Sequence, residues 1–203
     1  MTDDDFDIYL ASGSPRRREL LEQIGISYRI LMNDIDEIPA EGESAEEFAV
    51  RIAIDKAVAA SKTLSADVSQ PVLSADTVVC IDKNILGKPR DKQHAKEILQ
   101  KLSGQQHQVH TAVALIRQID GIVESCLSSS EVSFREISDK EIEQYWLTGE
   151  PQDKAGAYAI QGIGAMFVRH LSGSYSGVMG LPLYETAALL NKFGINTLSN
   201  TNK

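Results

Sequence analysis

Three arginines lie where the sequence predicts the start of a helix. In the stretch LASGSPRRRELL, Ser14 is a typical N-cap residue and Pro15 suits the first helical position. A cation in the first turn of a helix costs about 0.3–1 kcal/mol, because the helix N-terminus carries partial positive charge. Arg16, Arg17 and Arg18 are therefore poorly placed if stability is their only purpose.

A bound anion would reverse this balance. The unpaired N–H groups of the first turn, the helix dipole and the guanidinium groups would then all face the same negative charge. The small residues Ser12, Gly13 and Ser14 let the backbone approach a phosphate closely. We therefore predict a phosphate-binding site here. The alternative is a solvated surface helix whose arginines pair with Glu19 or Glu22.

An acid and further cations come from separate parts of the chain. Asp76 lies in VLSADTVVCI, a β-branched run typical of a buried strand, where an unpaired carboxylate is costly. Lys56 falls on the apolar face of the helix expected over residues 45–64, and the loop GKPR adds Lys88 and Arg90. A polyphosphate with a divalent cation would satisfy both sets of charges. The alternatives are a carboxylate bonded by backbone N–H groups and a lysine that extends to solvent.

The bulk composition is that of an ordinary globular protein with an acidic surface. The 203 residues carry a net charge of −9 and are 42% hydrophobic, so a single domain over residues 1–203 can bury a core. This acidity disfavours binding to nucleic acid or to a membrane surface. We expect no signal peptide in the first residues and no segment that spans a bilayer, because neither pattern is found in the sequence. Cys80 and Cys126 have no CxxC spacing. We expect a cytoplasmic protein with reduced thiols.

The order of elements favours an α/β fold with a mixed sheet. Strands are expected at residues 7–12, 27–34, 71–82, 107–120 and 122–137, and helices at 15–24, 45–64, 92–102, 139–149 and 181–193. Ser44 with Glu47 and Ser138 with Glu141 have the spacing of capping boxes. The glycine-rich residues 153–180 are expected to form loops and short strands.

Several motifs occur together and in a consistent order: LASGSPRRRELL, SADTVV, GKPRD, GQQHQVHTAVAL, DKAGAYAIQGIGA and GSYSGVMGLPL. Together they resemble the Maf family of nucleoside triphosphate pyrophosphatases, and the resemblance extends over residues 8–193. It implies an elongated α/β fold related to that of inosine triphosphate pyrophosphatases, with a central mixed sheet flanked by helices and two lobes around an active-site cleft. It also implies a homodimer and a reaction that converts a nucleoside triphosphate and water into the monophosphate and pyrophosphate.

The resemblance also implies roles for individual residues. Asp76 matches the catalytic acid, described in the family as the proton acceptor, and Asp76 and Glu37 match positions that hold a divalent metal, Mg²⁺ or Mn²⁺. The phosphate-binding positions correspond to Ser12, Arg17, Lys56 and Lys88, and the base-selecting positions correspond to Arg16, Thr77 and Gln161. This set resembles the branch that acts on dTTP and UTP. The sister branch, which acts on 7-methyl-GTP, typically has a bulky aromatic residue at the position of Arg16 and Glu at that of Gln161.

Three alternatives to a pyrimidine nucleotide pyrophosphatase stay open. The chain could belong to the 7-methyl-GTP branch, act as a phosphatase that releases orthophosphate, or bind nucleotides as a regulator of cell division. Among single residues, Asp153 is either a further acid of the cleft or a helix cap. Tyr158 and Tyr175 either stack on a base or pack in the core, and Arg18 is expected at the surface. The four histidines show no metal-ligand spacing.

Overall fold

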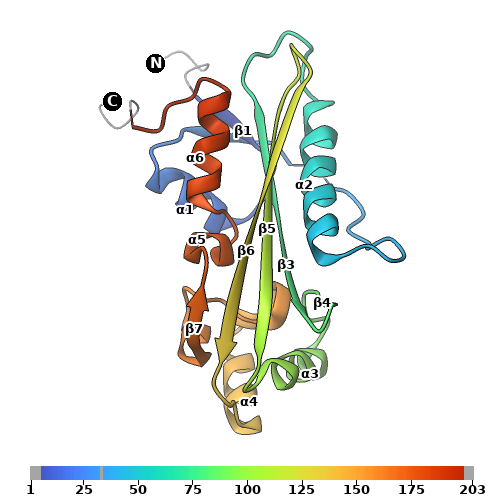
Figure 1. Ribbon diagram of the computed structural model, residues 1–203, viewed down its shortest axis with the longest axis vertical. Helices are drawn as coiled ribbons and strands as arrows, with labels where there is room; N and C mark the ends of the chain where they lie inside the picture. The colour runs from blue at the N-terminus through green and yellow to red at the C-terminus, as the bar shows by residue number, and fades with distance from the viewer. Residues whose placement is uncertain (1–5, 33, 199–203) are drawn as a thin grey trace.

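A seven-stranded mixed sheet forms the centre of the computed structural model, which describes residues 6–32 and 34–198 (Figure 1). The strand order is β2-β1-β3-β5-β6-β7, and β4 pairs with the far end of β3. The strands are β1 (Ile8–Leu10), β2 (Tyr28–Ile30), β3 (Val72–Ile81), β4 (Asn84–Leu86), β5 (Gln106–Arg117), β6 (Ile122–Phe134) and β7 (Val168–Ser172). β1 pairs in parallel with β2 and β3, and the other pairs are antiparallel, which confirms the expected mixed sheet.

Three long strands, β3, β5 and β6, run along the length of the molecule (Figure 1). β5 and β6 form the antiparallel pair predicted about Gly121, whose φ of +68° suits glycine. Asp82 and Lys83, both with positive φ, turn β3 back into β4. Successive side chains of a strand point to opposite faces of the sheet, so β3 and β5 each contribute to two faces.

Helices cover both faces of the sheet. They are α1 (Pro15–Gln23), α2 (Ala45–Ser61), α3 (Lys92–Leu102), α4 (Asp139–Leu147), α5 (Tyr175–Met179) and α6 (Leu183–Lys192). α2 packs on one face and α1 and α6 on the other, while α3 and α4 gather at one end of the molecule (Figure 1). Both predicted capping boxes are confirmed, with Ser44 and Glu47 bonded reciprocally at α2, and Ser138 and Glu141 at α4.

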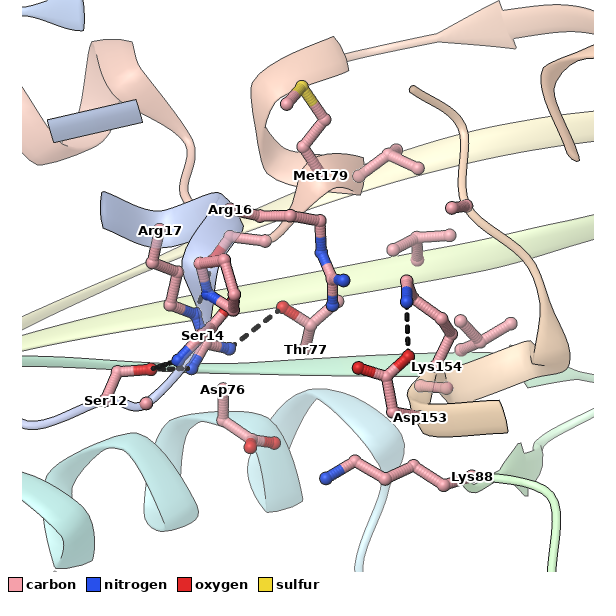
Figure 2. Close-up of a pocket in the computed structure, with 18 of the residues that line it drawn as sticks. Ser12, Ser14, Arg16, Arg17, Asp76, Thr77, Lys88, Asp153, Lys154 and Met179 are labelled. Carbon is pink, nitrogen blue, oxygen red and sulfur yellow. Dashed lines mark hydrogen bonds and ion pairs between the residues drawn. The ribbon is translucent and has the colours of Figure 1, made fainter. Parts of the chain in front are cut away.

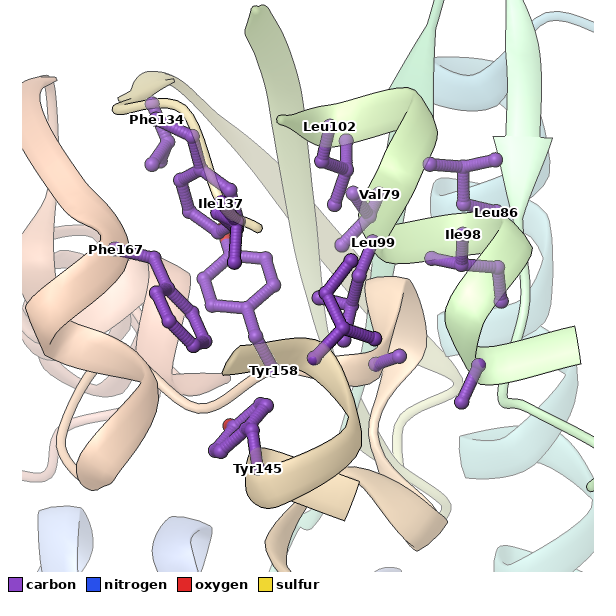
Figure 3. Close-up of a cluster of buried hydrophobic side chains, with 14 of the residues drawn as sticks. Val79, Leu86, Ile98, Leu99, Leu102, Phe134, Ile137, Tyr145, Tyr158 and Phe167 are labelled. Atoms are coloured by element: carbon purple, nitrogen blue, oxygen red, sulfur yellow. The ribbon is translucent and has the colours of Figure 1, made fainter. Parts of the chain in front are cut away.

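The buried side chains form separate clusters on the two faces and at the end of the sheet. α2 packs through Phe48 and Ile52, and on the opposite face α1 and α6 pack through Leu21 and Leu190. The end cluster joins α3 and α4 to the tips of β3, β5 and β6. Its centre is a group of aromatic rings, Phe134, Tyr145, Tyr158 and Phe167 (Figure 3). A smaller fourth cluster consists of Ala11, Ala60 and Val72. Ala11 of this cluster and Tyr158 of the end cluster line the candidate site. The assignment of the whole chain to one domain stays a prediction.

Three segments differ from the sequence-based expectation, and the first is β4, since no strand was expected at Asn84–Leu86. Besides β7, the glycine-rich segment forms the 3-10 helices η2 (Ala155–Ala157) and η3 (Ile163–Phe167) and the short helix α5, and η1 (Glu150–Asp153) ends at its first residue. Gly156, at a φ of +71°, packs so closely on β3 that an added Cβ would lie 3.0 Å from Val79 Cγ1. The strand expected over residues 27–34 is only the short β2, and Asn33 lies outside the described residues. Within the described chain, no helix has the length and apolar character needed to cross a membrane.

Candidate active site

The candidate site lies at a gap on one edge of β3. β1 pairs with β3 as far as Leu73, and β4 begins to pair with the same strand at Val79. Within residues 6–32 and 34–198, no strand pairs with that edge between these two positions, where Asp76 and Thr77 lie. Because side chains alternate, Asp76 points toward α2 and Thr77 points to the opposite face (Figure 2). The gap therefore joins both faces of the sheet in one cleft.

A cavity of about 390 Å³ occupies this cleft. It is lined by every residue to which the family resemblance gave a role: Ser12, Arg16, Arg17, Glu37, Lys56, Asp76, Thr77, Lys88 and Gln161. The fold thus gathers side chains that are far apart in the sequence. Other lining residues, such as Met32, Lys154 and Met179, were not selected by the sequence analysis. Their shared location supports one functional site, while the role of each residue stays a prediction.

Lys56 forms ion pairs with two carboxylates on the α2 side of β3. Its Nζ lies 2.8 Å from Asp76 Oδ1 and 2.7 Å from Glu37 Oε1. Asp76 is only 6% exposed, so the ammonium group offsets part of the cost of burying its carboxylate. Of the two alternatives for Lys56, the structure shows the lysine that enters the cleft. Within the described residues, Asp76 Oδ2 accepts no hydrogen bond from the protein.

Arg17 is held on the opposite side of β3 by three hydrogen bonds, of which Figure 2 marks those to Ser12 and Thr77. Its Nε donates to the Gly180 carbonyl at 2.9 Å, and its terminal nitrogens donate to Ser12 Oγ at 3.1 Å and Thr77 Oγ1 at 3.4 Å. Burial lowers the pKa of Arg17 and the charge of Asp76 opposes this effect, yet an arginine keeps its proton in proteins. A guanidinium has more N–H donors than these bonds use, so donors remain for phosphate oxygens.

The start of α1 opens into the same cavity. Ser14 is the N-cap and Pro15 follows it, as predicted, but within the described chain the Ser14 side chain accepts no N–H of the helix. Ser12 Oγ accepts one bond from Arg17 and another, at 3.2 Å, from the Ser14 N–H. The Ser12 hydroxyl can therefore still donate its own proton to another acceptor. Together with Arg16, which also lines the cavity, this arrangement suits an anion at the helix N-terminus.

Lys88 and the segment around Asp153 line the other side of the cleft. Lys88 extends from the loop after β4 toward Asp76 (Figure 2). Asp153 pairs with Lys154, and Lys154 rather than Asp153 is the N-cap of η2, so the helix-cap alternative for Asp153 is wrong. Partial burial raises the pKa of Asp153, but the bond from Lys154 and the charges of Lys154 and Arg16 outweigh it and lower the pKa. Asp153 thus lines the cleft as a carboxylate balanced by its neighbour.

Gln161 is an exposed residue on a loop that Glu150 holds in place. The Glu150 carboxylate accepts hydrogen bonds from the Tyr145 hydroxyl at 2.6 Å and from the backbone N–H groups of Ile163 at 2.8 Å and Gly164 at 2.9 Å. These bonds join α4, η1 and η3 around the loop. Glu150 was not predicted from the sequence, because nothing in its own neighbourhood distinguishes it from a surface acid.

Tyr158 lines the cavity and also packs in the core. It is 5% exposed, belongs to the end cluster, and its hydroxyl is hydrogen-bonded to His107 Nε2 at 2.9 Å. Three other candidates lie away from the cavity. Tyr175 is 51% exposed. Tyr175, Arg18 and Arg90 are not among the residues that line the cavity.

Two of the three carboxylates that line the cleft, Glu37 and Asp76, fit a metal that the substrate would help to bind. Within the part of the chain that the structure describes, no three His, Cys, Asp or Glu side chains are grouped as a metal cage. Mg²⁺ usually takes one or two carboxylates together with waters and substrate phosphates. Asp76 and Glu37 meet at the Lys56 ammonium, where positive charge is already favourable. This donor set suits a divalent cation shared between the protein and a triphosphate.

The chain resembles known proteins over nearly its whole length. A family profile described as "Maf-like protein" matches residues 7–193. The chain is 55% identical over 192 residues to a dTTP/UTP pyrophosphatase of Alkalilimnicola ehrlichii, with 93% of this chain and 94% of that protein covered. It is 49% identical to the dTTP/UTP pyrophosphatases of Saccharophagus degradans and Escherichia coli O157:H7. These matches cover 98% and 92% of this chain, and 94% and 92% of the two proteins.

Among solved structures, a HAM1 protein from Coxiella burnetii has a similar fold. The TM-score is 0.52 and the sequence identity is 19%, with 92% of this chain and 99% of that chain covered. At this identity the likeness concerns the fold alone, and it agrees with the α/β architecture described above. The family profile, in contrast, includes the start of α1, the strand that carries Asp76 and the loop that carries Gln161, and on this match the chain belongs to the Maf family.

Proposed function

We propose that this protein hydrolyses dTTP and UTP to the nucleoside monophosphate and pyrophosphate. The relatives named dTTP/UTP pyrophosphatase, at 49% to 55% identity, support this choice of substrates. The observation that carries the proposal is a buried acid among cations: Asp76 shares its cavity with Arg17, Lys56 and Lys88. A triphosphate attacked by water needs this combination of an acceptor for protons and positive charge around the phosphates.

The cations of the cleft would neutralise the triphosphate. Its negative charges repel an attacking oxygen and resist the departure of pyrophosphate. Arg17 offers N–H donors from one side of β3, the first turn of α1 adds its dipole, and Lys88 reaches in from the other side (Figure 2). Charges that are fixed before the reaction stabilise the charge that develops on the leaving group.

Asp76 would accept a proton from the attacking water. Lys56 bonds Oδ1 at 2.8 Å, which orients the carboxylate and leaves Oδ2 to bond the water. The water oxygen forms a bond to the α-phosphorus, and the bond from that phosphorus to the oxygen bridging to the β-phosphorus breaks. Pyrophosphate leaves with that oxygen, and Asp76 holds the proton that the water has lost.

A divalent cation, Mg²⁺ or Mn²⁺, would be held by Asp76 and Glu37 together with phosphate oxygens. When bound, it supplies positive charge that neutralises the phosphates. Glu37→Gln tests this proposal, because it removes one charged donor while leaving an oxygen for Lys56. We expect the metal concentration for half-maximal activity to rise, whereas an unchanged metal dependence would remove Glu37 from the site.

Gln161 suits the pairing edge of a pyrimidine. Uracil and thymine present carbonyl acceptors and an N–H donor, and a neutral side-chain amide offers both a donor and an acceptor. An ionised glutamate accepts only, which suits the donors of a guanine edge. Arg16 lines the same cavity and can donate to a base carbonyl. Thr77, also expected to select the base, bonds Arg17, so it orients a phosphate-binding group as well.

A product assay tests the proposed function. The purified protein is incubated with UTP, dTTP, GTP, ATP and 7-methyl-GTP in Mg²⁺ or Mn²⁺, and the products are separated by ion-exchange chromatography. We expect UMP and dTMP, each with an equal amount of pyrophosphate. Release of orthophosphate would identify a phosphatase, and a preference for 7-methyl-GTP would identify the sister branch. Nucleotide binding without turnover would indicate a regulator.

We also propose that the protein is a cytoplasmic homodimer. Cys80 and Cys126 are free thiols, which suit a reducing compartment. The dimer rests on the resemblance to the family. Light scattering on the purified protein should give twice the mass of one chain, and the mass of a single chain would contradict the proposal.

A further inference from the structure

We propose that Thr111 of β5 is a positioning residue that fixes the orientation of Arg17. The inference rests on the proposed function, in which Arg17 binds phosphate. Thr111 lies directly opposite Thr77 in the β3–β5 pair, is 0% exposed and is not among the residues that line the cavity. Most fully buried hydroxyls are hydrogen-bonded, and the partners of the Thr111 hydroxyl lead to the active-site cleft.

The hydrogen bonds of Thr111 have a fixed direction. Its Oγ1 lies 2.8 Å from the carbonyl oxygen of Gly177 and 3.0 Å from Thr77 Oγ1. A hydroxyl has a single proton and a carbonyl can only accept, so Thr111 donates to Gly177 and accepts the proton of Thr77. The lone pairs of Thr77 are then left for Arg17, whose terminal nitrogen donates from 3.4 Å.

A second connection to Arg17 runs through α5. The Gly180 N–H bonds back to the Gly177 carbonyl at 2.9 Å, so both glycines belong to one turn at the end of this helix. The Gly180 carbonyl accepts the Nε–H of Arg17 at 2.9 Å. Thr111 therefore anchors the same turn that holds the Nε side of the guanidinium. Both routes from Thr111, through Thr77 and through α5, end on Arg17.

The network explains what the segment GSYSGVMGLPL contributes to the site. Gly180 has a φ of +121°, a conformation that side chains other than glycine rarely adopt. A Cβ there would lie 3.6 Å from Thr77 Oγ1 and 3.7 Å from Arg17 Nε, so this backbone lies directly against both side chains. The segment thus supplies the Gly180 carbonyl that accepts from Arg17 and the Gly177 carbonyl that accepts from Thr111.

Loss of the Thr111 hydroxyl should make the orientation of the Arg17 side chain less fixed, although no residue that lines the cavity is changed. Thr111→Val keeps the side-chain shape but removes the hydroxyl. The Thr77 hydroxyl and the Gly177 carbonyl then each lose their hydrogen bond to residue 111. We expect kcat/KM to fall about tenfold, for UTP and dTTP alike and mainly through kcat, because fixed orientation matters most where charge develops. Thr111→Ser retains a hydroxyl and should restore kcat/KM to within about threefold of the parent protein.

Thr186→Val is the matched control. Thr186 is also a 0% exposed threonine, but its Oγ1 has no hydrogen-bond partner within the described residues. This variant should therefore keep the kcat/KM of the parent protein. A double-mutant cycle adds the direct test of coupling: in an Arg17→Ala background, Thr111→Val should lower kcat/KM by less than about twofold. Should Thr111→Val not fold, Thr111→Cys, whose thiol is only a weak donor, replaces it in every measurement.

A measurement independent of turnover follows the Arg17 Nε–H itself. In protein labelled with ¹⁵N-arginine, its NMR signal is assigned by its loss in Arg17→Lys. We expect its exchange with solvent to become about tenfold faster in Thr111→Val and to stay unchanged in Thr186→Val. The inference is overturned if Thr111→Val keeps both the kcat/KM and the exchange rate of the parent, or loses the same factor with and without Arg17. If the parent does not hydrolyse UTP, the proposed function fails, and the exchange rate alone then decides the role of Thr111.

Discussion

Replacing Asp76 by asparagine should abolish hydrolysis and leave the fold intact. Asparagine keeps a carbonyl oxygen where Oδ1 now accepts from Lys56 at 2.8 Å, and Lys56 keeps its second partner, Glu37, at 2.7 Å. The structural loss is therefore at most one weakened hydrogen bond, which is worth about 0.5–1.5 kcal/mol. For a chain of this length, we expect the melting temperature to change by no more than about 3–6 °C.

The rate should respond much more strongly than the stability. An amide cannot take a proton from water, and the loss of a general base lowers rates by about 10²–10⁴-fold. This range corresponds to about 2.7–5.4 kcal/mol of additional activation free energy. In the absence of a divalent metal, nucleotide affinity should hold or increase, because the substitution removes a negative charge that would repel the triphosphate.

The assay measures kcat with UTP by pyrophosphate release, and affinity by calorimetry with the non-hydrolysable analogue α,β-imido-UTP. Asp55→Asn is the matched control, because it makes the same change at an acid outside the cavity. Asp55 lies on α2 next to Lys56, is half-exposed, and pairs with Arg51 at 3.4 Å. This control should hydrolyse UTP at the parent rate. A folded Asp76→Asn protein whose kcat lies within a few-fold of the parent would refute the assignment of Asp76 as the base.

Three further predictions concern the phosphate site, the base and the loop that carries Gln161. Arg17→Ala and Lys88→Ala should each lower kcat/KM equally for UTP, dTTP and GTP, because the phosphates are the same whatever the base. A loss confined to one nucleotide would contradict the assignment of these two residues to the phosphates. Gln161→Glu should lower kcat/KM for UTP about tenfold, through a mismatched pairing edge, and unchanged UTP kinetics would rule out this base pocket. Partial burial raises the pKa of Glu150, but hydrogen bonds from Tyr145 and two backbone N–H groups outweigh it and lower the pKa below 4.5. Its ionised form therefore stabilises the protein above about pH 4.5, and this contribution is lost as the pH falls through the folded pKa. The melting temperatures of the parent and Glu150→Gln should converge in acid, and a difference that is independent of pH would argue against this reading.

Local signals were sufficient to predict the central part of the site. Asp76 is conspicuous because a carboxylate interrupts a strand of apolar residues, and Lys56 because it lies on the apolar face of its helix. Both line the cavity, and the structure joins them by an ion pair. The capping boxes at Ser44 and Ser138 are confirmed too, and they also depend on a local signal, because each serine and its partner glutamate lie within one helical turn.

Residues that act through distant partners could not be found in this way. Thr111 contacts Thr77 at a separation of 34 residues and Gly177 at 66, and in its own strand it resembles any other β-branched residue. The glycine-rich segment was also only partly predictable, because its turns are set by contact with other elements. Gly156 packs against Val79, and the next turns are held by Glu150.

The gap on β3 also bears on how this protein avoids aggregation. An unpaired strand edge can accept an extended segment of another chain, which is a common route to unwanted association. Here β1 blocks one end of the gap and β4 blocks the other, so an incoming strand would have to displace one of them to pair over a useful length. The ion pair of Asp76 with Lys56 places charge at the centre of the remaining edge, which further disfavours such pairing. The opening that admits a nucleotide to both faces of the sheet is thus too short and too polar to recruit another strand.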